Sequence, residues 1–315
     1  MRMRDLILAL AGCALFASSA FAEEPPSFLL AWGSYGTGDG EFNFPVGVAA
    51  DGTGHVYVAE AFNNRVQEFT DSGSFLRKWG SLGSGPGQFN RPRAIAVGPD
   101  GSVYVADYAN DRLQKFTSDG AFLKEWVCVP AGVAVDSDGN VYVAEDGNYR
   151  IQKFTSDGVF LLAWGASAIG DGRGFGPWSV SVDGNSNVYV TDNLSQRVVK
   201  FTDRGTYLTQ WGTAGSGDGQ FFDPRDVAID ASGNVYVAEL GNNRIQKFTD
   251  TGTFLTKWGS AGSGPGMFGV PSGIEVDAGG NVYVADTGNH RIQKFGKSPV
   301  PIAPMSWGKV KAAYR

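Results

Sequence analysis

Residues 224–259 read PRDVAIDASGNVYVAELGNNRIQKFTDTGTFLTKWG. Four short runs rich in β-branched and aromatic residues follow one another in it, at 226–230, 234–239, 244–248 and 253–258. Each run is bounded by Gly, Asn, Asp or Pro, as strands joined by tight turns are. The stretch therefore predicts four consecutive antiparallel strands.

The same pattern occurs six times along the chain. A proline, a tyrosine in the context Val-Tyr-Val and an arginine all repeat every 47 residues, and all three share one shortened step of 38 residues. The tyrosines are Tyr57, Tyr104, Tyr142, Tyr189, Tyr236 and Tyr283, and the arginines are Arg65, Arg112, Arg150, Arg197, Arg244 and Arg291. Repeats of four antiparallel strands at this period are typical of propeller blades. We therefore predict an all-β, six-bladed β-propeller with four-stranded blades.

The sixth repeat lacks its fourth strand, and the missing piece stands at the other end of the chain. Residues Phe28–Gly33 (FLLAWG) carry the fourth-strand pattern without a repeat before them. We expect this segment to pair with Arg291–Phe295, because the pairing closes the ring and leaves no free sheet edge at the join. The propeller is then expected to occupy residues 23–296.

The repeat consensus P-x-G-V-A-V-D, G-N-V-Y-V-A-D/E, N-x-R-I-Q-K-F, D-G-x-F-L-x-x-W-G closely resembles the NHL repeat family. The resemblance extends over all six repeats, and it implies a propeller fold. Enzymes, sensor ectodomains and RNA-binding regulators of the family share this architecture, so the resemblance leaves the function open.

The two ends of the chain lie outside the repeats. Residues 1–22 have a basic start, an apolar stretch and Ala20-Phe21-Ala22, which predicts a signal peptide cleaved after Ala22 and a secreted or periplasmic protein. The alternative is a lipoprotein anchored at Cys13, since Leu10–Cys13 (LAGC) matches a lipobox. Residues 297–315 break the repeat and form a short basic tail, either a docking segment or a disordered end.

Charge argues against nucleic acid as a partner. Residues 23–295 carry a formal net charge of −11, because the −6 of the whole chain includes +1 from residues 1–22 and +4 from residues 296–315. A body of this charge repels phosphate backbones. We expect a monomeric ring without an integral membrane segment, and a protein, peptide or glycan as its partner.

Residues present in every blade are expected to be structural: the repeated arginines and acids order the hairpin between the second and third strands, and the repeated Trp and Phe form the core. A binding surface is expected where one blade differs from the others. The residue after each repeat proline is the most variable column, and it includes Arg93, Trp178 and Arg225. The turns between the second and third strands vary as well and emerge on the same rim. Exposed aromatic residues and arginines are typical of binding patches. The predicted binding rim consists of Arg93, Trp178, Arg225, Asp226, Phe62, Tyr108, Tyr149 and His290.

A second difference between the blades lies in the first strand of each blade, which is expected to line the central channel. Small residues of the repeat are replaced by Ser179, Ser181, Asp226 and Glu275, and these side chains either form a polar cluster at the channel mouth or are solvated by channel water. The third repeat lacks the glycine-rich connector and carries Val127-Cys128-Val129 instead. This change predicts a notch in the rim, with Cys128 buried and inert.

The residues favour binding over catalysis. After residue 22 the chain has two histidines, His55 and His290, which are predicted on opposite rims and therefore cannot share a metal. A calcium-dependent hydrolase needs several converging carboxylates, and only Asp226 and Glu275 qualify. We therefore expect no cofactor, no metal and no catalytic residue. The alternative is a propeller-type hydrolase or lyase, similar to a lactonase, with a polar site at the channel mouth.

Overall fold

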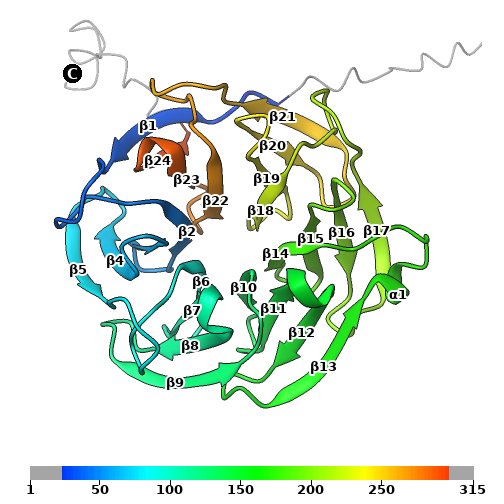
Figure 1. Cartoon of the computed structure of the whole chain (residues 1–315). Coiled ribbons are helices and arrows are strands. Elements are labelled where there is room, and N and C mark those ends of the chain that lie inside the picture. Colours follow the sequence, from blue (N-terminus) through cyan, green and yellow to red (C-terminus); the bar gives the residue numbers. More distant parts are fainter. Residues whose placement is uncertain (1–22, 298–315) are drawn as a thin grey trace, which may run out of the picture.

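The computed structural model describes residues 23–297, which form six four-stranded antiparallel sheets arranged as a ring (Figure 1). Every sheet is one blade, and its innermost strand lines the centre of the ring. The all-β, six-bladed propeller predicted from the repeat is confirmed. The predicted signal peptide, the predicted lipobox cysteine Cys13 and the tail from residue 298 lie outside the described residues.

The strands follow the sequence repeat closely. From the innermost strand outward, the first blade is β2 (Pro45–Ala50), β3 (His55–Glu60), β4 (Arg65–Thr70) and β5 (Phe75–Trp79). The second is β6 (Pro92–Val97), β7 (Val103–Asp107), β8 (Arg112–Phe116) and β9 (Phe122–Val127), and the third is β10 (Gly132–Val135), β11 (Val141–Glu145), β12 (Arg150–Phe154) and β13 (Phe160–Gly165). The fourth is β14 (Pro177–Val182), β15 (Val188–Asp192), β16 (Arg197–Phe201) and β17 (Tyr207–Trp211), and the fifth is β18 (Pro224–Ile229), β19 (Val235–Glu239), β20 (Arg244–Phe248) and β21 (Phe254–Trp258). The sixth is β22 (Pro271–Val276), β23 (Val282–Asp286), β24 (Arg291–Gly296) and β1 (Ser27–Trp32).

The helices of the described residues are single turns in connections. They are α1 (Ala166–Ile169) and the 3₁₀ turns Tyr108–Asn110, Asp146–Asn148 and Thr287–Asn289. No helix formed by residues 23–297 is long and apolar enough to cross a membrane.

Strand β1 completes the sixth blade as predicted. It pairs antiparallel with β24, with Phe28 opposite Phe295 and Trp32 opposite Ile292. The Trp32 ring also packs against Phe69 of the first blade, with 5.9 Å between ring centroids. The N-terminal segment therefore joins the last blade to the first one.

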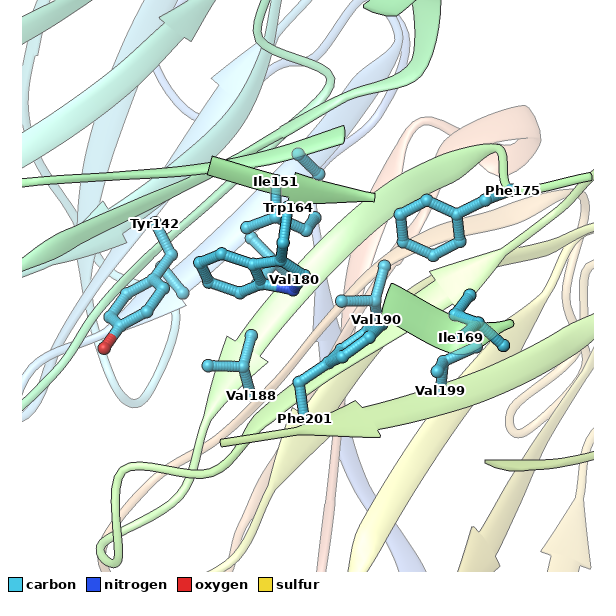
Figure 2. Packing of buried hydrophobic residues seen from close by; sticks show 12 residues of the cluster. Tyr142, Ile151, Trp164, Ile169, Phe175, Val180, Val188, Val190, Val199 and Phe201 are labelled. Atoms are coloured by element: carbon cyan, nitrogen blue, oxygen red, sulfur yellow. The ribbon is translucent and has the colours of Figure 1, made fainter. Parts of the chain in front are cut away.

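The hydrophobic core lies between neighbouring blades. In the cluster of Figure 2, Tyr142, Ile151 and Trp164 of the third blade face residues such as Val188 and Phe201 of the fourth. Equivalent clusters join the other blades, and the rings of the repeated Trp, Tyr and Phe lie in edge-to-face or tilted contact. The repeated aromatic residues are core, as the sequence indicated.

The repeated arginines stabilise the blades. Arg112 Nε donates to Asp107 Oδ2 at 2.8 Å, and its Nη atoms donate to the carbonyls of Ser84, Gly85 and Gln88 in the glycine-rich connector. The predicted structural role of the arginine–carboxylate pair is confirmed in this blade, because the pair fixes both the hairpin and the connector.

Candidate functional site

A cavity of about 400 Å³ occupies the channel at the centre of the ring. Its walls are the innermost strands β2, β6, β10, β14, β18 and β22, which surround the centre of Figure 1. Valine, isoleucine and alanine side chains make most of the wall. The predicted residues Arg93, Trp178, Arg225, Ser179, Ser181, Asp226 and Glu275 all line this one cavity.

Three large side chains meet at the mouth of the channel. The guanidinium carbon of Arg93 lies 3.4 Å from the centroid of the Trp178 ring, and that of Arg225 lies 3.9 Å from it. Arg93 belongs to the second blade and Arg225 to the fifth, and these blades stand opposite each other in the ring (Figure 1). The three side chains therefore cross the mouth from one wall to the other, held by cation–π contacts.

Both arginines keep hydrogen-bonding capacity. Arg225 Nη2 donates to Asp223 Oδ2 at 2.8 Å, and Arg93 Nη1 lies 3.8 Å from Asp146 Oδ2, which is beyond hydrogen-bond distance. Arg93 Nη1 and Arg225 Nε are buried and have no hydrogen-bond acceptor among residues 23–297. Burial lowers the pKa of Arg93 to about 10, so its guanidinium is still charged at neutral pH.

Asp226 connects three blades just below the mouth. Its Oδ1 accepts hydrogen bonds from Ser179 Oγ of the fourth blade and from the Val227 N–H, and its Oδ2 accepts from the Ile274 N–H of the sixth blade at 2.8 Å. Burial nevertheless raises the pKa of Asp226 to about 6. The carboxyl therefore has a structural role in addition to facing the cavity.

Glu275 accepts fewer hydrogen bonds than Asp226 does. It stands at a channel position where four blades carry alanine and the fourth blade carries Ser181. The hydrogen bond that the structure gives it comes from the Val276 N–H, at 3.2 Å. Burial, and then the negative charge of Asp226, raise the pKa of Glu275 to about 8. At neutral pH Glu275 is mostly a neutral carboxylic acid, able to donate a hydrogen bond into the cavity.

Of the remaining predicted rim residues, Tyr108 joins the group at the channel mouth and the others do not. Tyr108 lies under Arg93, with 4.4 Å between the guanidinium carbon and the ring centroid. Phe62 packs on Phe44, and Phe44 in turn lies beside His290. Tyr149 is exposed on the third blade, apart from these contacts.

Sequence reasoning missed Tyr35 and Phe44, which join Phe62 and His290 in an exposed aromatic group. Tyr35 and His290 rings are 5.0 Å apart, and His290 Nδ1 accepts a hydrogen bond from the Phe44 N–H at 3.4 Å. In three other blades Asn64, Gln196 and Asn243 accept the equivalent bond. His290 thus connects the sixth blade to the first one.

The two histidines lie at opposite ends of the blades, and neither lines the cavity, although His290 contacts Phe44, which does. His55 Nδ1 lies 3.1 Å from Asp51 Oδ2 at the start of β3, whereas His290 precedes β24 at the opposite end of the blades. Within residues 23–297, no group of three or more His, Cys, Asp or Glu side chains is placed to hold a metal ion. Cys128 is buried, and burial raises the pKa of its thiol well above the ordinary value.

Comparison with protein families identifies the repeat. Residues 42–69, 89–116, 127–154, 221–248 and 268–295 match the NHL repeat. The chain is a member of the NHL repeat family. One matched segment lies in each blade except the fourth. The fourth blade of this NHL protein contains the candidate site residues Trp178, Ser179 and Ser181. No curated protein sequence matches the chain.

Solved structures share the propeller fold at low identity. A catalytically inactive histidine-to-alanine variant of virginiamycin B lyase from Staphylococcus aureus, with quinupristin, is 17% identical with a TM-score of 0.58, covering 81% of this chain and 85% of the lyase. An auxiliary nutrient binding protein from Bacteroides thetaiotaomicron is 15% identical with a TM-score of 0.60, covering 81% and 69%. A Bacteroides thetaiotaomicron protein of unknown function is 18% identical with a TM-score of 0.65, covering 85% and 76%. At these identities the likeness concerns the fold.

Proposed function

We propose that this NHL protein is an exported, non-enzymatic binding propeller that recognises a carboxylate-bearing peptide or glycan at the channel mouth. The observation that carries the proposal is the pair of buried donors, Arg93 Nη1 and Arg225 Nε, that have no acceptor among residues 23–297. A buried donor without an acceptor costs more free energy on a charged guanidinium than on a neutral group, and a ligand that supplies the acceptor explains the pair. A carboxylate offers two acceptor oxygens to two guanidinium groups.

Stacking on Trp178 favours this use of the arginines. The ring holds the guanidinium planes in place, so that little side-chain entropy is lost when a ligand binds. The N–H groups of the two guanidinium groups then bind the ligand. Because the body of the protein carries a formal net charge of −11 from residue 23 to residue 295, recognition of an anion must come from these local contacts and not from the overall field.

The cavity below the mouth suits the uncharged part of such a ligand. Ser181 and the protonated Glu275 offer hydrogen bonds, and the surrounding valine and alanine side chains are apolar. A volume of about 400 Å³ accommodates one sugar or one to two amino-acid residues, not a folded domain. The rest of a longer ligand would lie on the rim.

Paired compounds test the proposal. Glucuronic acid against glucose, and a short peptide with a free C-terminus against its amide, are each added to the purified ring while its thermal midpoint is followed. A ligand at about 100 times its Kd stabilises the folded state by about 2.7 kcal/mol. We expect the acids to raise the midpoint and their neutral counterparts to leave it unchanged. Equal effects within both pairs, or no effect of any acid, contradict the proposal.

Arg91 offers a matched control. It is exposed on the same rim, two residues before Arg93, but it does not line the cavity. Arg91→Ala removes the same charge as Arg93→Ala without touching the mouth. Stabilisation by the acids should survive in Arg91→Ala and be lost in Arg93→Ala.

A second candidate is acid–base catalysis, because two carboxyls with pKa values of about 6 and 8 face one cavity. Asp226 would act as the base and Glu275 as the acid of a lyase or hydrolase. The inactivating substitution in the lyase structure is at a histidine, whereas neither His55 nor His290 lines this cavity, so that chemistry does not carry over directly. Mass spectrometry of the bound acids after long incubation tests this candidate. A product that Glu275→Gln abolishes supports catalysis, and unchanged ligand contradicts it.

A further inference from the structure

The connectors between blades are held by three side chains that recur in the repeat. In the second blade, Asn110 Nδ2 donates to the Gly83 carbonyl, Arg112 to those of Ser84, Gly85 and Gln88, and Gln114 Nε2 to that of Gln88. These distances lie between 2.7 and 2.9 Å. The first, fifth and sixth blades repeat the arrangement with their own asparagine, arginine and glutamine. An Asn–Arg–Gln set of this kind therefore binds the main chain of a glycine-rich turn.

The third blade has the same side chains without the turn. Asn148, Arg150 and Gln152 stand in the three positions, but the connector before this blade is nine residues shorter. Arg150 retains its Nε bond to Glu145 at 2.5 Å, and the structure gives its Nη atoms no partner among residues 23–297. Its side chain is 45% exposed, against 8% for Arg112.

Neighbouring residues confirm that the space of the turn is open. In the connector before the second blade, Gly80 follows Trp79, has a φ of +99° and lies against the ring of Phe89, where a Cβ would come within 2.5 Å of that ring. Before the third blade, Val127 at the end of β9 takes the place of this glycine and is 85% exposed. The core beneath is filled by Cys128, which packs with Phe154. What is open is thus the polar surface of Asn148 and Arg150, with Gln152 buried beneath it, and not a hole in the core.

We propose that Asn148, Arg150 and Gln152 form a docking cradle that binds a glycine-rich turn of a partner polypeptide through its main-chain carbonyls. The turn must come from outside the propeller, because the glycine-rich connectors of the first, second, fifth and sixth blades are each held by their own blade. The connector before the fourth blade is likewise held by Arg197, which donates to the Gly174 carbonyl. The site is separate from the channel mouth.

Charge favours carbonyl dipoles over an anion at this cradle. Glu145, which is fully buried, lies directly against Arg150 and offsets its charge. A second acidic residue, Asp146, directly follows Glu145 in the sequence. A guanidinium paired in this way still has free N–H groups for neutral acceptors, but it attracts a phosphate or carboxylate only weakly. The occupied blades carry the same pair and bind carbonyls, so they show the ligand chemistry directly.

The probe is a synthetic peptide with the sequence of residues 81–88 (SLGSGPGQ), labelled for fluorescence anisotropy and titrated with residues 23–297. We expect saturable binding that Arg150→Lys weakens about tenfold, because lysine keeps the charge beside Glu145 but loses the fork of donors. Asn148→Ala should weaken binding a few-fold. Asn63→Ala removes the same side chain from the first blade, whose cradle is occupied, and should change nothing.

A loop-filled variant gives the opposite control. Residues 80–91 replace residues 127–129, so that the third blade receives its own turn. Circular dichroism and the thermal midpoint establish that this variant folds, and it should no longer bind the peptide. Absence of saturable binding to the unmodified propeller, or binding unchanged in Arg150→Lys and in Asn148→Ala, overturns the proposal, whether or not the loop-filled variant folds. Arg225→Ala should not affect the peptide, which separates this result from the proposed function.

Discussion

Glu275 allows the electrostatics of the cavity to be tested without any ligand. Its pKa is raised from 4.5 to about 8 by burial and by Asp226. A raised carboxyl pKa means that the folded state prefers the protonated form. The stability associated with Glu275 is therefore fully present below about pH 4.5 and is lost as the pH rises to about 8.

The size of the effect follows from the shift. A shift of about 3.5 pKa units corresponds to roughly 5 kcal/mol. Because Glu275 is partly exposed to the cavity, we expect about half of this, ~2–3 kcal/mol, to appear as lost stability. Glu275→Gln is neutral at every pH and escapes the loss. The variant should therefore be as stable as the original protein at pH 4.5 and more stable by ~2–3 kcal/mol at pH 9.

Thermal midpoints at pH 4.5, 7 and 9 measure this difference. For a chain of this size the expected gain corresponds to a midpoint about 5 °C higher or more at pH 9. Glu24→Gln, at an exposed position outside the cavity, serves as the control and should show no pH-dependent gain. The reasoning fails if Glu275→Gln is no more stable than the original protein at pH 9. It also fails if the variant gains the same stability at pH 4.5 as at pH 9.

Three further predictions concern the ring and its ends. Deleting residues 23–33 removes β1 and the Trp32 contacts with Phe69, and should cost at least ~5 kcal/mol; an unchanged denaturation midpoint would show that β1 does not close the ring. The Cys128 thiol should not react with a thiol reagent at pH 8 until denaturant is added, since it is buried with a raised pKa, and rapid labelling of the folded protein would place it at the surface. Intact mass of protein purified from its host should correspond to a chain beginning at Glu23, whereas a lipid-modified Cys13 would make it a membrane-anchored lipoprotein.

Sequence repetition was sufficient to predict the fold. The tyrosine, arginine and proline columns share one period, so they located every blade, and the missing fourth strand of the last blade located β1. The structural roles of the repeated arginines and aromatic residues followed because a residue present in every blade serves a need of every blade. Comparison of the six repeats also selected Arg93, Trp178 and Arg225, which line one cavity.

Contacts across the ring could not be predicted in the same way. The position of Arg93 in its repeat predicts its height in the channel. It does not predict that the side chain reaches Trp178, which lies two blades away. The bond from the Phe44 N–H to His290 joins residues 246 positions apart and exists only because the ring closes. Arg150 occupies the same position in its repeat as the other five arginines, so the sequence predicts the same role for it. Its side chain is exposed because its own repeat lacks the turn that covers the others.

The central claim is that Arg93, Trp178 and Arg225 bind an acidic ligand at the channel mouth. Its most direct test is calorimetric titration of the acid that stabilises the ring most, into the original protein and into the double variant Trp178→Ala with Arg225→Ala. Circular dichroism first establishes that the variant is folded. Binding hot spots of this kind contribute about 2 kcal/mol or more each, so the double variant should bind at least about 30-fold more weakly. A folded double variant with an unchanged Kd would contradict it.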